Sequence, residues 1–465
     1  MTMQEFLWIG GRRPKGLRGT ITLPPSKSYI HRALFVASLC RGLSRISNCG
    51  LDYSEDVLAT IRTLRALGTK IESAKGGSEI LVYGRGGVSS APKAVDAGGS
   101  GTTARFAISL AALAADRGMT RIVGNDSLSG RPMQPLLVAL AELGVYCYSE
   151  KEDGTLPLVV EGRGIPGGLC TIDGSVSSQF ISSLLISCVK AYTPCTIKIK
   201  NPSKLVSVPY LRATSSVLKH FGFERSFEHK SASYKVPGNQ SARGKDFAVP
   251  GDMSSAASLI AVAVASLGKV RLLGVDPSFP QSDFDFLDTA RRFGAKVVQT
   301  KNSVSVDATG LPENAKKRKI TLDLKDSPDL GPVTAGLGAA RSVRELTIKN
   351  IAHLRFKESD RISAISKEFR KLRIPTRETP SSLSIFAKDD AKKRKPSRKP
   401  ILLESYDDHR IVMALAAAAL SGRFGEVMIS NPACVKKSYP NFISDVQKLV
   451  REPGLVRVVK RRVRD

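Results

Sequence analysis

The sequence predicts an α/β protein of two domains, each built from three copies of a β-α-β-α-β-β unit. The main observation is a polar turn that leads into a helix of small and apolar residues. This turn occurs six times, at steps of 73, 76, 76, 75 and 80 residues. After each first helix come a strand-like segment and then a second helix. A fixed period of this kind marks a repeated supersecondary unit.

The six turns are rich in Gly, Ser, Pro and Asp, the residues that begin helices. Counted at equivalent positions, they lie at Ser26, Gly99, Ser175, Gly251, Asp326 and Tyr406. The strand-like segments that follow the first helices all end near Asn or Gly. They are Ser44–Asn48, Thr120–Asn125, Thr196–Asn201, Val270–Gly274, Leu346–Asn350 and Val427–Asn431.

Each unit continues with a second helix and two alternating strands. The predicted second helices are Ser54–Leu67, Arg131–Leu143, Val208–Phe221, Ser282–Phe293, Lys357–Leu372 and Tyr439–Leu449. The first four are followed by a glycine, which favours the left-handed residue that ends a helix. Closing strands are exemplified by Lys296–Gln299 with Ser303–Asp307, where apolar and polar residues alternate.

The six copies divide into three plus three. We expect one domain at 22–245 and a discontinuous one made of 1–21 and 246–465, with the crossover near Ser241–Lys245. Because the strand Thr20–Leu23 precedes the first turn, we expect Met1–Arg18 to pair with the C-terminal half. Lys388–Pro400 is interpreted as a charged insertion in the last copy.

Composition limits the possible partners. The formal net charge is +29, and much of it lies in the runs Lys316–Lys319, Lys392–Lys399 and Lys460–Arg464. Such runs are usually exposed loops or tails, and aromatic residues do not alternate with them as in single-strand binders. We therefore expect small anionic substrates, no nucleic-acid partner and a monomer. A basic repeat protein that binds nucleic acid is the alternative from a different class.

The apolar runs are too short to span a bilayer, and the N-terminus lacks the layout of a signal peptide. We therefore expect a cytoplasmic protein. Seven cysteines without a C-x-x-C pair argue against a disulfide framework or a zinc site. Since no H-E-x-x-H, carboxylate-rich loop or nucleotide-binding glycine motif occurs, we expect no metal and no cofactor.

The repeated turns also suggest chemistry. When parallel helices have their N-termini side by side, their positive dipole ends and free N–H groups point in one direction. Such a cluster of N-termini binds phosphate or carboxylate. A single turn of this kind is ordinarily just a helix cap. Six turns in register, with cations close by, favour an anion-binding cleft between the two domains. The cations are Lys27, Arg32, Arg105, Arg131, Arg361 and Arg410.

Eight strings in order, from about Thr20 to about Phe442, resemble motifs of the EPSP synthase (3-phosphoshikimate 1-carboxyvinyltransferase) family. They are P-S-K-S-x-x-x-R-A-L, G-S-G-T-T-A-R, S-G-R-P-M, G-S-V-S-S-Q-F, P-G-D-M-S-S-A, K-E-S-D-R-I, D-D-H-R and K-S-Y-P. The resemblance implies two domains of the inside-out α/β barrel type. It also implies transfer of the enolpyruvyl group of phosphoenolpyruvate to the 5-hydroxyl of shikimate 3-phosphate, releasing phosphate, in the route through chorismate to aromatic amino acids.

Matching motifs imply the site residues. The phosphoenolpyruvate set is Lys27, Gly101, Arg131, Gln179, Arg361, Arg410 and Lys437. The shikimate 3-phosphate set is Lys27, Ser28, Arg32, Ser177, Ser178, Gln179, Ser207, Tyr210, Asp329 and Lys357. The resemblance gives the proton transfers to Asp329 and Glu358, assisted by Lys27, and leaves open which of Glu358 and Lys27 protonates the methylene carbon. Arg105 and Asp252 are expected to shape the cleft, and His409 to be structural.

Several assignments have plain structural alternatives. Ser207 and Tyr210 are also compatible with the ordinary start of a helix, and Arg361 beside Asp360 and Glu358 with a surface ion pair worth little. Two positions depart from the family pattern, since Gly99 and His353 stand where the family often has Asn. We expect these two to alter affinity or pH dependence and to leave the reaction unchanged. The rival within the same architecture is the enolpyruvyl transferase acting on UDP-N-acetylglucosamine, which usually needs a reactive loop cysteine.

Overall fold

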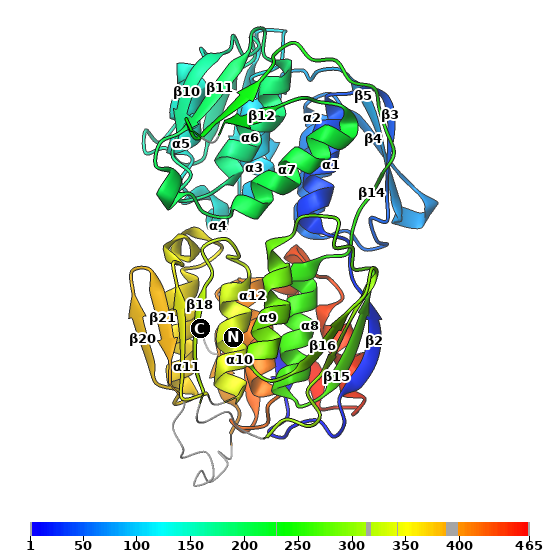
Figure 1. Ribbon diagram of the computed structural model, residues 1–465, viewed down its shortest axis with the longest axis vertical. Helices are drawn as coiled ribbons and strands as arrows, with labels where there is room; N and C mark the ends of the chain where they lie inside the picture. The colour runs from blue at the N-terminus through cyan, green and yellow to red at the C-terminus, as the bar shows by residue number, and fades with distance from the viewer. Residues whose placement is uncertain (1, 229, 313–317, 342, 387–398, 464–465) are drawn as a thin grey trace. The chain divides into compact units, whose positions relative to one another are not determined.

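The computed structural model describes residues 2–228, 230–312, 318–341, 343–386 and 399–463. The chain divides into two compact units (Figure 1). Unit 1 comprises Met1–Pro24, Gly251–Pro277 and Ser282–Asp465, and unit 2 comprises Pro25–Pro250 and Ser278–Gln281. Each unit has its own hydrophobic core. The fold class predicted from the sequence, a mixture of helices and mixed sheets, is confirmed.

Unit 2 contains three four-stranded sheets among its described residues. In order across each sheet, the first is β14 (Phe247–Ala248), β3 (Arg41–Ser47), β5 (Glu79–Arg85) and β4 (Lys70–Ala74). The second is β6 (Val95–Asp96), β7 (Met119–Val123), β9 (Leu158–Glu161) and β8 (Cys147–Ser149). The third is β10 (Gly168–Ile172), β11 (Cys195–Ile199), β13 (Ser233–Val236) and β12 (Ser226–Glu228).

The described part of unit 1 also holds three four-stranded sheets. The first is β2 (Arg18–Thr22), β15 (Lys269–Leu273), β17 (Ser303–Asp307) and β16 (Lys296–Gln299). The second is β18 (Lys319–Asp323), β19 (Glu345–Lys349), β21 (Ser382–Ile385) and β20 (Thr376–Thr379). The third is β22 (Ile401–Leu403), β23 (Val427–Ser430), β1 (Thr2–Ile9) and β24 (Val456–Val463).

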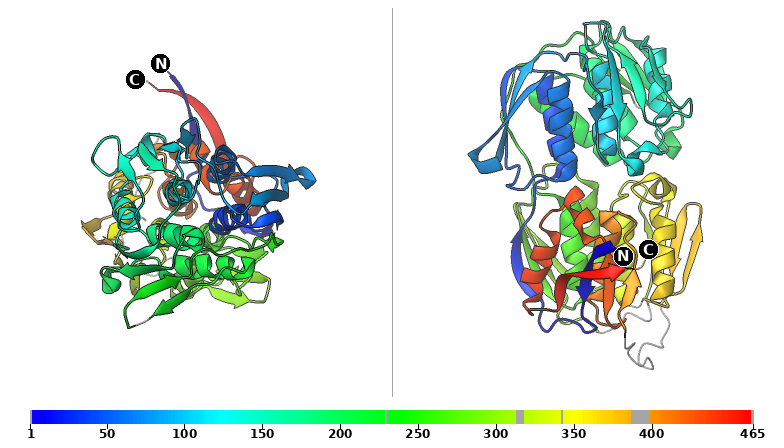
Figure 2. Two further views of the ribbon diagram at one scale, coloured as in Figure 1. Left: turned by 90° about the horizontal axis from the view of Figure 1, so that it is seen from above. Right: turned by 180° about the vertical axis from the view of Figure 1, so that it is seen from behind.

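These sheets share one pairing pattern. The first two strands of each run parallel and the remaining neighbours run antiparallel, as in the β18, β19, β21, β20 sheet. Parallel neighbours need a crossover connection, and in four of these sheets the first helix of the repeat provides it, as between β18 and β19. In the other five sheets the third position is taken by the last strand of the same repeat, such as β21. In the third sheet of unit 1 the N-terminal strand β1 takes this position. The predicted pairing of the N-terminal segment with the C-terminal half is thus confirmed (Figure 2).

After Pro24 and after Pro250 the chain passes from one unit to the other, and each of these passages separates a strand from the helix that follows it. Strand β2 leads into α1 (Lys27–Ser38) but pairs with β15 of unit 1. Strand β14 leads into α8 (Met253–Ala265) but pairs with β3 of unit 2. Unit 2 therefore extends past the predicted crossover at Ser241–Lys245, as far as Pro250.

The first helices form the buried centre of each unit. They are α1, α3 (Gly101–Ala111) and α6 (Gln179–Ser187) in unit 2, and α8, α10 (Leu330–Arg341) and α12 (His409–Ala419) in unit 1. Every residue of α8, α10 and α12 is buried, and the three helices pack against one another. This burial explains why their sequences are apolar all round instead of amphipathic.

Neighbouring first helices run in the same direction. Near their N-termini, Arg410 of α12 reaches the carbonyl of Ser254 in α8, and at their C-termini Ser266 donates to the carbonyl of Leu420. In unit 2, Gln179 of α6 donates to Thr102 of α3, and Ser187 donates to Ser109 further along. The predicted convergence of helix N-termini is confirmed for both pairs.

The second helices are α2 (Glu55–Ala66), α5 (Gln134–Glu142), α7 (Val208–Phe221), α9 (Asp285–Arg292), α11 (Arg361–Lys371) and α13 (Phe442–Val450), with a short α4 (Asp126–Ser129) before α5. The 3₁₀ turns are Lys75–Gly77, Cys188–Lys190, Pro202–Lys204, Ser282–Phe284, Ala352–Phe356 and Pro432–Lys437. The four glycines predicted to end helices all have positive φ. Arg373 and Arg451 take the same left-handed conformation after α11 and α13.

Three predicted helices begin too early. The segment before Gln134 is a turn that contains Pro132, so Arg131 lies outside α5. The segment from Lys357 to Asp360 is a loop, because Asp360 caps α11 by accepting from the Ser363 amide at 3.1 Å. Tyr439 likewise precedes α13, which starts after Pro440.

The predicted insertion Lys388–Pro400 and the basic run Lys392–Lys399 lie almost entirely outside the described residues, as does part of Lys316–Lys319. The run at Lys460–Arg464 was expected to be a loop or tail, and this is wrong for its described part, which belongs to β24 and pairs with β1. Among the described residues, no helix combines the length and apolar character needed to cross a membrane. All seven cysteines are free.

Candidate active site

The predicted site residues form two groups, one in each unit. In unit 2, Arg32 is held from three sides. Its Nε donates to Thr214 at 2.9 Å, and Nη1 and Nη2 donate to the carbonyls of Ser28 and Tyr210 at 2.8 and 3.2 Å. The Tyr210 ring also lies 5.6 Å from the guanidinium. Burial lowers the pKa of Arg32 to about 10, so it remains a cation at neutral pH. The motif thus fixes a buried positive charge beside Ser28.

Gly101 lies where two cations and an amide meet. A Cβ placed on Gly101 would be 3.3 Å from Nη1 of Arg105 and 3.3 Å from Nη1 of Arg131. Arg105 donates to Oε1 of Gln179 at 2.6 Å, and Arg131 is anchored by the Ser127 carbonyl at 3.0 Å. The three predicted residues Gly101, Arg131 and Gln179 are therefore brought together, and Arg105 orients Gln179.

Ser177 and Ser178 precede α6 and are both buried. The Ser177 hydroxyl accepts from the Gln179 amide at 3.2 Å, whereas the Ser178 side chain makes no cap hydrogen bond although it stands at the N-cap. Lys27, the first residue of α1, donates to Asp56 at 2.7 Å. Asp56 was not among the predicted site residues.

Ser207 is not an ordinary cap. It stands at the N-cap of α7 with φ 58° and ψ 40°, in the left-handed region, and its side chain makes no cap hydrogen bond. This conformation costs a non-glycine residue about 1–2 kcal/mol. The alternative that Ser207 is a side-chain cap is therefore wrong, and the conformation marks the position as one held by its surroundings.

In unit 1 the group is organised by Arg361. Its side chain is 1% exposed and pairs with Asp408 at 2.9 Å, Asp329 at 3.0 Å and Glu358 at 2.9 Å. Burial by itself would lower the pKa of Arg361, but the three carboxylates outweigh burial and raise it. Asp360 pairs with Arg355 instead. The alternative of a surface pair worth little is wrong for Arg361.

Asp329 joins two arginines. Its Oδ1 accepts from Arg361, and its Oδ2 accepts from Nη2 of Arg410 at 3.1 Å. Glu358 is contacted by Arg361 and, at 3.7 Å, by Lys437. Five predicted residues are therefore gathered here, namely Asp329, Glu358, Arg361, Arg410 and Lys437. Four of the five N–H donors of Arg361 have acceptors, and all of these are carboxylate oxygens.

Lys357 follows the 3₁₀ helix that carries His353. Burial, with Lys357 and Arg361 adding to it, lowers the pKa of His353 to about 3. His353 is therefore neutral at ordinary pH. The expectation that this departure from the family pattern alters pH dependence near neutrality finds no support in its titration.

Two carboxylates of this group were not predicted from the sequence. Asp408 is fully buried and anchors Arg361, and it stands in the D-D-H-R string without an assigned role. Asp283 accepts from Ser254 at 2.8 Å. Burial raises the pKa of Asp283 to about 7, with Asp329 adding to the shift and Arg410 opposing it. Only burial distinguishes Asp283 from other acidic residues, and its local sequence carried no signal.

Each group combines cations with hydroxyl or carboxylate groups, which suits anionic substrates and proton transfer. Within the described residues, no cluster of three or more His, Cys, Asp or Glu is arranged to hold a metal ion.

Comparison with known proteins identifies the same family that the sequence motifs resemble. The family profile described as EPSP synthase (3-phosphoshikimate 1-carboxyvinyltransferase) matches residues 12–446. The 3-phosphoshikimate 1-carboxyvinyltransferase of Korarchaeum cryptofilum is 37% identical over 439 residues, covering 94% of this chain and 97% of its own length. The enzyme of the same name from Methanococcoides burtonii is 37% identical, with 93% and 96% covered.

Solved structures show the likeness of fold. An EPSP synthase from Acinetobacter baumannii superposes with a TM-score of 0.72 at 23% identity, covering 98% of this chain and 100% of its own. The enolpyruvyl transferase NikO from Streptomyces tendae gives a TM-score of 0.72 at 18% identity, with 99% of each chain covered. Because both enzymes fit equally well, the fold alone does not choose between acceptor substrates.

Proposed function

The chain belongs to the EPSP synthase (3-phosphoshikimate 1-carboxyvinyltransferase) family, and from this premise we propose which side chains perform its reaction. The protein is a transferase of the shikimate pathway. It moves the enolpyruvyl group of phosphoenolpyruvate to the 5-hydroxyl of shikimate 3-phosphate and releases phosphate, on the way to chorismate and the aromatic amino acids.

The addition needs two proton transfers, and the elimination needs one. In the addition, the 5-hydroxyl oxygen bonds to C2 of phosphoenolpyruvate, the hydroxyl loses a proton and the methylene carbon gains one. In the elimination, the bond from C2 to the phosphate oxygen breaks and the new methyl group gives up a proton. We assign the hydroxyl proton to Asp329 and the carbon-bound proton to Glu358, with Lys27 as the other candidate for the carbon.

One observation carries this assignment: Arg361 holds Asp329 and Glu358 at 3.0 and 2.9 Å, so two carboxylates are fixed on one buried guanidinium. General acid–base groups contribute about 10²–10⁴-fold each when they are positioned in this way. The contacts also suggest that Arg361 mainly positions the two carboxylates, because most of its donors are already used. Arg410 and Lys437 are the cations beside them.

The substrates carry carboxylate and phosphate groups, for which arginine and lysine are the natural partners. The proposal gives phosphoenolpyruvate to Arg131, Gly101, Gln179, Arg410 and Lys437, together with Lys27 and Arg361. It gives shikimate 3-phosphate to the second set, which combines hydroxyls and cations with one amide and one carboxylate. Its members are Lys27, Ser28, Arg32, Ser177, Ser178, Gln179, Ser207, Tyr210, Asp329 and Lys357.

We also propose how the repeats are distributed between the domains and what kind of protein they form. The shared strand order of the six sheets supports six copies of one unit, with three in each domain. A cytoplasmic monomer that acts on small anions, without a nucleic-acid partner, fits the composition and the substrates. The charged runs are interpreted as solvated surface.

The test is a pair of isosteric variants. Asp329→Asn and Glu358→Gln keep the shape of each side chain but replace one acceptor oxygen by an NH2 group and remove the charge, so each should lose turnover by roughly 10²-fold or more. Binding of shikimate 3-phosphate, measured by calorimetry, should survive in Glu358→Gln. Glu378→Gln, an exposed carboxylate of the same unit, is the control. Near-normal turnover of either folded variant would remove that residue from the mechanism.

A further inference from the structure

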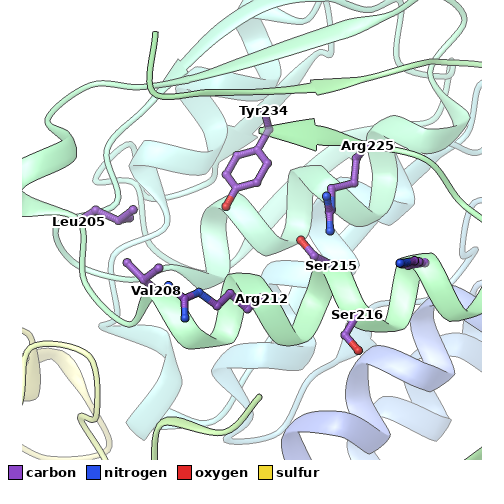
Figure 3. A pocket seen from close by; sticks show the side chains of 8 residues that line it. Leu205, Val208, Arg212, Ser215, Ser216, Arg225 and Tyr234 are labelled. Atoms are coloured by element: carbon purple, nitrogen blue, oxygen red, sulfur yellow. The ribbon is translucent and has the colours of Figure 1, made fainter. Parts of the chain in front are cut away.

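A pocket of about 440 Å³ lies along one face of α7 in unit 2 (Figure 3). Three cations line it. Arg212 and Lys219 come from α7 itself, and Arg225 comes from the segment that follows it. Within the described residues, none of the three forms an ion pair. A pocket lined by three unpaired cations and no carboxylate is suited to an anion.

Arg225 gives the strongest sign of a missing partner. Its side chain is half-buried, and its Nε is buried with no hydrogen-bond acceptor among the described residues. An unsatisfied buried donor costs about 1–3 kcal/mol, more when it is charged. Ser215 and Ser216 also line the pocket, and Figure 3 shows the Ser215 hydroxyl on the side of α7 that faces Tyr234.

The rest of the wall is apolar and aromatic. Leu205 and Val208 line one end, and Figure 3 shows the Tyr234 ring pointing from the sheet toward α7. Burial raises the pKa of Tyr234, while Arg225 and Arg212 oppose this, so its hydroxyl keeps its proton at neutral pH. A phenol ring beside arginines suits a ligand with a flat apolar body and an anionic end.

The pocket is distinct from the candidate active site. An α-helix turns about 100° per residue. Val208, Arg212, Ser215 and Lys219 therefore share one face of α7, whereas Tyr210 and Thr214, which hold Arg32, lie on the opposite face. None of the pocket residues belongs to either substrate set.

We propose that this pocket binds a small aromatic anion, with the charged end at Arg212, Lys219 and Arg225 and the ring against Tyr234, Leu205 and Val208. The same chemistry is offered by aromatic carboxylates and by phosphate monoesters of phenols.

The test is calorimetric titration of the whole protein, without substrates, at low salt. The probes are 4-hydroxybenzoate, phenyl phosphate, inorganic phosphate and the neutral analogue 4-hydroxybenzamide. We expect one of the aromatic anions to bind at least about tenfold more tightly than both inorganic phosphate and the amide. Equal binding of inorganic phosphate would overturn the aromatic part of the proposal, and binding by neither aromatic anion would overturn all of it.

Variants locate the bound probe. Arg212→Gln with Arg225→Gln should weaken binding at least about tenfold, and Ser216→Trp, which fills the pocket without changing charge, should abolish it. Lys198→Gln with Lys200→Gln removes the same charge from exposed positions of unit 2 and should leave binding within about twofold. Ser177→Ala with Ser178→Ala should also leave it unchanged. Binding lost in the last pair but kept in Ser216→Trp would place the probe in the active site and overturn the proposal.

Discussion

Asp408 accepts two hydrogen bonds from Arg361, at 2.9 Å from Nε and 3.3 Å from Nη2, and neither side chain is more than 1% exposed. Asp408 lies at the N-cap of α12 and Arg361 is the first residue of α11, so this pair joins two helix starts. Through it, Asp408 fixes the guanidinium that holds both proposed proton-transfer carboxylates. Asp408 is accordingly a positioning residue.

Asp408→Ala should destabilise unit 1 strongly. The substitution leaves two buried N–H donors of Arg361 without acceptors, each worth about 1–3 kcal/mol, while Asp329 and Glu358 still balance the positive charge. Denaturant unfolding checks the free energy. Asp288→Ala, which removes the exposed partner of Arg291, is the control and should cost less than about 1 kcal/mol. Equal losses in the two variants would show that the Asp408 pair is worth no more than a surface pair.

Gly101→Ala should weaken phosphoenolpyruvate binding. Its new Cβ would lie 3.3 Å from the guanidinium nitrogens of Arg105 and Arg131, so Arg131 must shift by a few tenths of an ångström. We expect the KM for phosphoenolpyruvate to rise by about tenfold, the equivalent of 1.4 kcal/mol. Gly130→Ala is the control, because a Cβ there meets open space. An unchanged KM in Gly101→Ala would contradict the assignment.

Ser177→Ala with Ser178→Ala should raise the KM for shikimate 3-phosphate by about tenfold or more. Each hydroxyl is worth about 1–3 kcal/mol toward a charged group. The KM for phosphoenolpyruvate should change much less. Ser175→Ala removes a hydroxyl from the same turn that is not assigned to the substrate, so steady-state kinetics of this variant should match the wild type. A double variant with normal kinetics would contradict the assignment of Ser177 and Ser178 to shikimate 3-phosphate.

Asp283→Asn should stabilise the protein in a pH-dependent way. Burial raises the pKa of Asp283 from 3.8 to about 7, so the folded state binds its proton more tightly than the unfolded state. The contribution of this group to stability is therefore lost as pH rises from about 4 to about 7. The asparagine cannot ionise but still accepts from Ser254.

Urea unfolding of wild type and Asp283→Asn at pH 4.5 and pH 8 checks this prediction. The variant should gain at least about 1 kcal/mol relative to the wild type between the two pH values. A difference that does not change with pH would mean that Asp283 ionises normally in the folded protein.

The repeat pattern was predictable because it is local. Turns, first helices and their strands follow each other within a few residues, and each carries its own signal, such as the glycines after α2, α5, α7 and α9. Helix starts were predicted less well. Helices α5 and α11 begin later than predicted, after Pro132 and after the Asp360 cap. The apolar periodicity continues through both positions, but a single turn or cap residue decides where the helix begins.

Long-range pairing was harder to predict. The pairing of β1 with the C-terminal half was expected, but the pairing of β14 with β3 joins residues about 200 positions apart, and nothing local specifies it. Burial is equally invisible in a sequence. Arg361 beside Glu358 and Asp360 resembles a surface pair until Asp408, from another helix, is seen to enclose it. The same holds for Asp283 and for the left-handed Ser207.

This chain joins phosphoenolpyruvate to shikimate 3-phosphate, and the release of inorganic phosphate tests this reaction most directly. The measurement uses both substrates, then each alone, and then UDP-N-acetylglucosamine in place of shikimate 3-phosphate. We predict release only with phosphoenolpyruvate and shikimate 3-phosphate together, with one carboxyvinyl product formed per phosphate. Release without shikimate 3-phosphate, or release with UDP-N-acetylglucosamine instead, would contradict the account.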